Sequence, residues 1–287
     1  MLRRLPPQWI LMAPGALIML FFFILPVGQL LLFSFFRSTP DGMMEKAFVF
    51  DQYMTFFKDP HYLKILGRTL VLGITISFIS LILGYCLAYG VARSNPKRKY
   101  ILLLLIALPL LTSAVIRNFG WIVILGRKGL LNQLFLNIGL IDKPLDLLYT
   151  STGVVIAMVH VLLPFMVLVL YSVLEGMDRN LESAAANMGA SPAKVFWFVT
   201  LPLSLPGIVA GTLLVFSISI SFYITPALIG GPRVQVMATE IYNQTIHSMN
   251  WPYASALAVI LLVTVFVITN LYNRALRRST SQGAGIL

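Results

Sequence analysis

Long uncharged runs alternate with short charged segments along the 287-residue chain. Residues 5–36 contain no charged side chain, and neither do residues 69–92. A helix crosses the hydrocarbon core of a bilayer with about 20 apolar residues, so each run is long enough for one span. With four further apolar segments, the pattern predicts six transmembrane helices at about 9–36, 69–92, 100–125, 147–174, 207–229 and 253–273. We therefore expect an all-α integral membrane protein with a single membrane domain over residues 1–287.

Basic clusters at the ends of two runs predict which side faces the cytoplasm. Residues 93–99 contain four Lys or Arg, and residues 274–278 contain three Arg. An excess of Lys and Arg near span ends marks cytoplasmic loops. This places both termini and residues 178–206 on the cytoplasmic side of a multi-pass protein.

The composition agrees with a membrane protein. Hydrophobic residues make up 58% of the chain and charged residues 11%, against about 25% charged in soluble domains. Lys and Arg outnumber Asp and Glu by 21 to 10, a net charge of +11. In a membrane protein this excess fits cytoplasmic loops and anionic lipid headgroups, and no pattern for nucleic-acid binding is present. We expect membrane lipids as partners and no nucleic acid.

Motifs for nucleotide, metal and covalent chemistry are absent from the sequence. It contains no GxxxxGK[ST], HExxH, CxxC or GxSxG, and the single Cys86 excludes a disulfide within the chain. Without the glycine-rich phosphate loop, the chain has no such means of holding ATP. We expect no catalytic residue, no metal and no cofactor, and an energy source outside this chain.

Residues 178–206 interrupt the hydrophobic pattern without looking like a simple turn. Asp178 or Asn180 can cap a helix, and the alanine-rich segment 181–188 favours helix. Gly189 suits the left-handed residue that closes a helix. Ser191 followed by Pro192 suits the start of a second helix, which Pro202 and Pro206 are expected to end. The segment predicts a helix, a glycine turn and a helix between two spans.

This segment resembles the cytoplasmic EAA loop of the permease subunits of bacterial ABC importers. The matching positions are Ala184, Ala185, Gly189, Ala190, Ser191, Phe196, Val199, Leu201 and Pro202. The family glutamate falls on Ser183, while Glu182 lies one residue earlier, about 100° around a helix, and therefore faces another side. The resemblance implies an importer permease fold in the bacterial inner membrane and a coupling role for this segment, Glu182 and Ser183 included.

The fifth predicted span carries small and hydroxyl residues. Gly207 and Gly211 form a GxxxG pattern, which lets helix backbones approach closely in lipid. Steps of three and four residues continue to Leu214, Ile218, Ser221 and Thr225. Close helix packing explains the glycines. Pro226 and residues 230–232 break the helix, and broken backbone at membrane depth is typical of a cavity wall. Tyr223, with Ser221 and Thr225, is therefore a candidate for the substrate pathway, or an interface anchor.

A second polar break lies at residues 117–121. Arg117 is either functional or extends to the interface. Asn118 and Trp121 are further candidates for the pathway, although Trp121 also suits an interface belt. His160 is expected to be a satisfied packing residue. Glu240 is the best-placed outer carboxylate for a cationic solute, or a solvated loop charge.

Residues 117–121 followed by 129–132, together with residues 225–244, are similar to the spermidine/putrescine branch of these permeases. Related branches import opines, ferric iron or phosphonates. The resemblance implies a complex of this chain with a second related permease, two ATPase subunits and an extracytoplasmic binding protein. A secondary transporter driven by an ion gradient would need titratable groups within its spans, and only His160 and Arg117 qualify. A membrane scaffold without transport activity is the third class.

Overall fold

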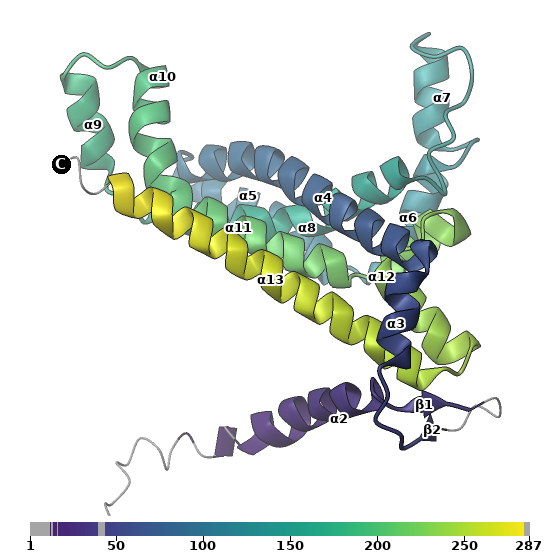
Figure 1. The fold of residues 1–287 in the computed structure, drawn as a ribbon. Helices are drawn as coiled ribbons and strands as arrows, with labels where there is room; N and C mark the ends of the chain where they lie inside the picture. Colours follow the sequence, from purple (N-terminus) through teal and green to yellow (C-terminus); the bar gives the residue numbers. More distant parts are fainter. Residues whose placement is uncertain (1–11, 13, 16, 40–43, 284–287) are drawn as a thin grey trace, which may run out of the picture. The chain divides into compact units, whose positions relative to one another are not determined.

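The computed structural model describes residues 12, 14–15, 17–39 and 44–283. Within this part the backbone is helical, apart from short connections and one hairpin of two strands (Figure 1). The chain forms two compact units. The first contains the described residues up to Lys64 together with Glu240–Phe266, and the second contains Ile65–Thr239 and the chain from Val267 onward.

The first unit begins with an apolar helix over Leu17–Phe33. Its elements are η1 (Leu20–Ile24), α2 (Leu25–Phe33), β1 (Arg37–Ser38), β2 (Met44–Glu45), α3 (Asp51–Lys58), η6 (Asn243–His247) and the first part of α13 (Trp251–Gly283). Strands β1 and β2 pair antiparallel. Helix α3 follows the second strand, and residues 40–43 between the two strands lie outside the described residues.

The loop between α2 and α3 folds around aromatic side chains. The Phe35 ring stacks on Phe48, with 5.2 Å between ring centroids, and meets Phe50 edge-on at 5.3 Å. Ser34 Oγ and the Tyr53 hydroxyl lie 2.7 Å apart, which joins the end of α2 to α3. These contacts hold α3 against the segment that precedes it.

The second unit contains most of the membrane-type helices. Its elements are α4 (Pro60–Ala92, from Ile65), α5 (Pro96–Ala107), η2 (Leu108–Leu111), α6 (Ala114–Leu125), α7 (Leu130–Asn137), α8 (Ser151–Glu175), α9 (Arg179–Asn187), α10 (Pro192–Val195), η3 (Phe196–Thr200), α11 (Leu201–Ser221), η4 (Pro226–Gly230), η5 (Gly231–Arg233) and α12 (Met237–Tyr242), whose last residues belong to the first unit.

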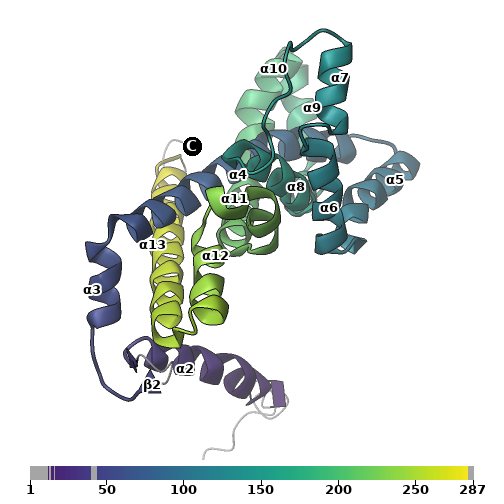
Figure 2. The ribbon, with the colours of Figure 1, turned by 90° about the vertical axis from the view of Figure 1, so that its right-hand side faces the viewer.

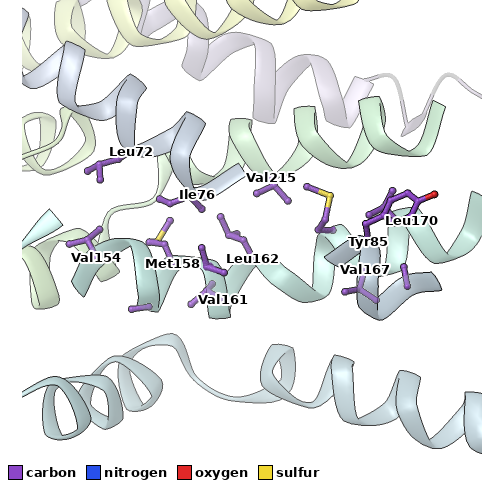
Figure 3. Close-up of a cluster of buried hydrophobic side chains, with 14 of the residues drawn as sticks. Leu72, Ile76, Tyr85, Val154, Met158, Val161, Leu162, Val167, Leu170 and Val215 are labelled. Carbon is purple, nitrogen blue, oxygen red and sulfur yellow. The ribbon is translucent and has the colours of Figure 1, made fainter. Parts of the chain in front are cut away.

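The core of the second unit lies along α8, which is packed against α4 and α11. Figure 3 shows Leu72, Ile76, Val154, Met158 and Leu162 from α4 and α8 pointing toward one another, with Val215 of α11 beside them. All of these side chains are buried. Lipid tails are as apolar as leucine, so this packing gains close van der Waals contact rather than escape from water.

The GxxxG pattern forms the seam between α11 and α8. A Cβ added at Gly207 would lie 3.0 Å from Val173, and one added at Gly211 would lie 2.7 Å from Met166 Sδ. Both glycines are buried. A larger residue at either position would push against the side chains of α8, which confirms the packing role expected for the pattern.

Among the described residues, four helices are long and apolar enough to cross a membrane: Pro60–Ala92, Ser151–Glu175, Pro192–Ser221 and Trp251–Arg274. A bent pair of helices supplies a fifth candidate if it is one span. The expected first span at 9–36 corresponds in part to the helix Leu17–Phe33, and the rest of it lies outside the described residues. The total of six spans, and their grouping as one domain, stay predictions.

The third span is not the continuous helix expected over residues 100–125. The segments Pro96–Leu111 and Ala114–Asn137 meet at an angle of 95°, and Figure 2 shows α5 and α6 as separate helices. Between them Thr112 is extended and Ser113 has φ of −53° and ψ of 133°, so neither residue is helical. Pro109 has no backbone N–H to continue the helical hydrogen bonds, and the polar pair Thr112–Ser113 completes the break. The apolar pattern alone did not reveal this bend.

The expectation that Pro202 and Pro206 end a helix is wrong. Helix runs from Pro192 to Ser221 through both prolines. The π turn η3 precedes Pro202, and the Leu201 N–H donates to the Phe196 carbonyl, five residues back. This turn shifts the hydrogen-bond ladder just before the proline, and membrane helices tolerate proline through such local adjustment.

Candidate functional site

The segment between α8 and α11 has the helix, turn and helix expected from the sequence. Asp178 Oδ1 accepts from the Asn180 backbone N–H at 2.9 Å and caps α9. Ser191 Oγ accepts from the Lys194 N–H at 3.5 Å at the start of α10. Between the two helices, Gly189 has φ of +85°. Figures 1 and 2 both show α9 and α10 side by side, joined by this turn.

Gly189 closes α9 with a double hydrogen-bond motif. Its N–H donates to the Ala186 carbonyl at 2.9 Å, and the Ala190 N–H donates to the Ala185 carbonyl at 3.1 Å. This pattern requires a left-handed residue at the position of Gly189. A Cβ added there would meet nothing within 4 Å, so backbone conformation and not space selects glycine.

One side of α9, here called its free side, is largely exposed in the described chain. Ser183 and Ala184 are exposed and Ala185 is half-buried. Met188, directly before the turn, is 90% exposed. A large exposed methionine next to two alanines gives a small apolar surface at the tip of the segment. Such a surface is typical of a contact site for another protein.

Glu182 faces the opposite way and binds within the chain. Its Oε1 accepts from the Arg93 guanidinium and, at 2.6 Å, from the Thr200 hydroxyl. The two charged side chains are only 25% and 19% exposed. Ser183, at the family glutamate position, donates to the Arg179 carbonyl of its own helix at 3.2 Å. The expected difference in direction between positions 182 and 183 is therefore confirmed.

Further contacts join the segment to α4. Arg179 Nη2 donates to the Ala92 carbonyl at 2.8 Å. The Phe196 ring meets Tyr85 and Tyr89 edge-on, with centroids 5.8 and 5.7 Å apart. Leu201 packs against the core of the second unit and Pro202 is exposed. Arg93 and Thr200 were not among the residues singled out from the sequence, because nothing in the pattern indicates a partner 89 or 18 positions away.

Arg117 and Asn118 lie where the third span bends. Arg117 Nη1 donates to the Pro109 carbonyl at 2.5 Å, a carbonyl beside the break in the helix. Asn118 is fully buried and donates to the Ala114 carbonyl at 2.8 Å. Its Oδ1 and the Arg117 Nε have no partner among the described residues. The Arg117 guanidinium is therefore bound by a backbone carbonyl at the bend of the third span.

Trp121 and His160 form a pair between α6 and α8. Trp121 Nε1 donates to His160 Nδ1 at 3.3 Å, and the rings meet edge-on at 5.4 Å. His160 is therefore a satisfied histidine, as expected. The Trp121 indole N–H is directed to α8, so its orientation is fixed by this contact.

The polar stripe expected along the fifth span ends earlier than its spacing implies. Helix α11 stops at Ser221, and Phe222 is extended, so helical periodicity does not carry on to Thr225. Ser221 is exposed, Tyr223 is half-buried and Thr225 is fully buried. Pro226 begins a new helical turn rather than ending the span. The three hydroxyl residues therefore do not share one helix face.

The break itself is confirmed and is anchored by two residues with positive φ. Gly231 has φ of +52° and Tyr149 has φ of +62°. The Tyr149 N–H donates to the Ile229 carbonyl at 2.8 Å, and a Cβ on Gly231 would lie 2.7 Å from the Tyr149 ring. Thr225 Oγ1 has no hydrogen-bond partner within the described residues.

Glu240 belongs to the first unit and is not a freely solvated charge. It is 6% exposed. Its Oε1 accepts from Gln244 Nε2 at 2.8 Å. Glu240 is thus largely buried and hydrogen-bonded to Gln244, one helical turn further along the chain.

Comparison with known proteins gives the family of the chain. Residues 80–282 match the family described as "Binding-protein-dependent transport system inner membrane component". The chain is 35% identical over 259 residues to the spermidine/putrescine transport system permease protein PotB of Haemophilus influenzae, covering 90% of each chain. It is 33% identical over 256 residues to PotB of Escherichia coli, covering 89% of this chain and 93% of that protein.

Solved structures agree on the fold. One chain of a bacterial ABC transporter involved in the import of the acidic polysaccharide alginate superposes with a TM-score of 0.77 and 21% identity, covering 95% of this chain and 96% of that one. The fold is therefore that of an ABC importer permease, a membrane component that carries no ATPase domain of its own. On these matches, the chain belongs to the family of inner membrane components of binding-protein-dependent transport systems.

Proposed function

We propose that this chain is the permease subunit of an ATP-driven importer that moves a polyamine, spermidine or putrescine, across the inner membrane. The observation that carries this proposal is the similarity to two spermidine/putrescine permeases over about nine-tenths of the chain. A shared length of this extent covers both the segment at α9 and the broken helices around residues 112 and 222.

The importer would contain a second related permease, two ATPase subunits and an extracytoplasmic binding protein that delivers the solute. ATP would bind only to the ATPase subunits, since this sequence has no glycine-rich phosphate loop. Both termini and the segment 178–206 would lie in the cytoplasm, where the ATPase subunits have access to ATP.

In this assembly the free side of α9 would dock on an ATPase subunit. The exposed Ala184, the half-buried Ala185 and the exposed Met188 support this role, because small side chains let a helix lie close to a partner. Closure of the ATPase pair would move α9. The contacts of Glu182 with Arg93 and Thr200 would pass this movement to α4 and η3.

The pathway for the solute would run along the two helix breaks. Asn118 and Trp121 lie on α6, and Tyr223 and Thr225 follow the end of α11. Helix α6 packs against η4, the turn that starts after Thr225, so the second unit brings the two breaks together. The buried Asn118 Oδ1 and Thr225 Oγ1 support a polar lining at this seam.

The deciding experiment is transport by the reconstituted complex. Proteoliposomes that contain this chain with its partner subunits and binding protein are loaded with ATP, and uptake of radiolabelled spermidine and putrescine is measured. We expect uptake that requires ATP and the binding protein and survives collapse of the proton gradient. Uptake of an opine, ferric iron or a phosphonate in place of polyamine would reassign the solute, and uptake abolished by an ionophore with ATP present would overturn the importer itself.

A further inference from the structure

A groove of about 410 Å³ lies between α4 and α5, beside the turn that joins them. Its walls include Cys86, Leu87 and Gly90 from α4 and Leu102, Leu105 and Ile106 from α5. The volume falls within the range of about 300–1,000 Å³ found for small-molecule pockets. A Cβ added at Gly90 would meet nothing within 4 Å, so the space above this glycine is open.

The groove offers an occupant almost no polar contact. Its one hydroxyl, Ser94 Oγ, donates to the Gly90 carbonyl of its own helix at 2.7 Å. Leu87 and Leu105 on its two walls are exposed in the described chain, as is Cys86. A flexible apolar chain fits this lining, whereas a free anion or a polar solute would leave its own polar groups unpaired.

One end of the groove carries a positive charge on the matching helix face. Arg98 lies four residues before Leu102 and seven before Leu105, so the three share one side of α5. Side chains on a helix lean toward its N-terminus. Arg98 precedes the apolar wall, so its side chain leans away from Leu102, toward the turn between α4 and α5 at the end of the groove.

The basic residues around this turn are not equivalent. Arg93 pairs with Glu182, and Lys99 pairs with Glu175 at 2.6 Å. Among the residues that the structure describes, Lys97 and Arg98 are both exposed and neither has an acidic partner. Lys97 lies about 100° around the helix from Arg98, on the side of Ile101 and away from the groove.

We propose that this groove is a binding site for an anionic phospholipid. One acyl chain lies along the apolar walls between α4 and α5, and Arg98 contacts the phosphate of the headgroup. The groove is apolar, and Arg98 at its end has no acidic partner in the described part of the chain. Together they favour a molecule that has both an apolar chain and an anionic head. This inference goes beyond transport, because lipid retention is measurable whether or not the complex moves a polyamine.

The test uses the purified assembly that contains this chain, stripped of lipid and then mixed with equal amounts of phosphatidylglycerol and phosphatidylcholine. Native mass spectrometry counts the lipids that stay bound. We expect selective retention of phosphatidylglycerol. Arg98→Gln should lower that selectivity on the order of fivefold, since one basic residue near an anionic surface contributes ~1 kcal/mol.

Two further variants make the test specific to the groove. Lys97→Gln removes the same charge from another face of α5 and should retain the selectivity. Gly90→Leu places a side chain in open space within the groove and should lower phosphatidylglycerol retention while Arg98 is intact. Equal effects of Lys97→Gln and Arg98→Gln would reduce the finding to general surface charge and overturn the site. If Gly90→Leu retains as much phosphatidylglycerol as the unchanged chain, the lipid does not occupy the groove. This conclusion holds whether or not the variant complex loses a partner subunit.

Discussion

Arg93 and Glu182 are 89 residues apart in the sequence, and their side chains pair where α4 ends. The same carboxylate oxygen of Glu182 also accepts from Thr200. One acidic side chain of α9 is therefore held by two elements of the second unit, the end of α4 and the π turn that leads into α11. In the proposed importer this places Glu182 between the ATPase contact and the transmembrane helices.

Replacement of Glu182 by Gln should weaken this connection. The neutral amide cannot keep the ion pair with Arg93, and a hydrogen bond to a charged group contributes about 1.5–3 kcal/mol. We expect the complex to assemble, uptake to fall severalfold, and ATP hydrolysis to respond less to loaded binding protein. Glu175→Gln is the matched control, since it removes the Lys99 pair at the end of α8 and does not touch α9. Full stimulation and full uptake in Glu182→Gln would contradict the proposed connection.

Replacement of Gly189 by Val should disrupt the turn through backbone strain alone. A β-branched residue at φ of +85° is strained by about 1–3 kcal/mol, and no neighbouring atom obstructs the new side chain. We expect the spans to remain inserted and uptake to be lost. Gly189→Asn should retain much of the activity, because asparagine tolerates the left-handed region better. Uptake and stimulated ATPase activity in proteoliposomes distinguish the two, and equal activity of both variants would argue against a strained turn.

A bulky side chain on the free side of α9 should prevent docking. Ala184 is exposed, so Ala184→Trp is accommodated by the folded chain but would hold a partner surface away. We expect loss of the ATPase subunit on purification, or ATP hydrolysis that no longer responds to binding protein. Ser183→Ala should be nearly neutral, because the serine hydroxyl bonds to its own helix. Co-purification of normal amounts of ATPase with Ala184→Trp would show that this side of α9 is not the contact.

Removal of the Tyr223 side chain should affect transport more than assembly. Tyr223 is half-buried directly after α11 ends, beside the break in the helix that the proposed pathway follows. We expect Tyr223→Ala to reduce polyamine uptake at least severalfold in a complex of normal composition. Ser221→Ala serves as the control, since its hydroxyl donates within its own helix at 3.1 Å. If the complex falls apart instead, Tyr223 supports the structure rather than the pathway.

The cytoplasmic placement of two turns is directly testable by labelling. In a Cys86→Ser background, single cysteines at Asn95 and at Met188 report on the turn before α5 and on the tip of α9. Both positions are exposed, so access depends on the side of the membrane. We expect labelling by a membrane-impermeant maleimide only after the cells are opened. Modification of either position in intact cells would invert the proposed orientation.

The sequence by itself predicted the membrane class and most of the helices. It also predicted a cap at Asp178 or Asn180, of which Asp178 is the one used, the cap at Ser191 and the left-handed Gly189. These features depend on residues within a few positions of one another, and each has a local cause. Uncharged length sets a span, a short side-chain oxygen caps a helix, and a glycine accepts positive φ. The GxxxG seam was predicted for a similar reason, since small residues four apart share one helix face.

Only the tertiary structure decided the features that join distant segments. The partners of Glu182 and the Trp121–His160 pair come from residues 18 to 89 positions apart, which no local pattern relates. The bend at Thr112 and the continuous helix through Pro202 were also missed. Proline ends, kinks or permits a helix according to whether neighbouring turns can satisfy the freed carbonyls. Whether they can depends on packing against other helices. The sequence therefore indicated where the helix could bend or end, and only the tertiary structure determined whether it did.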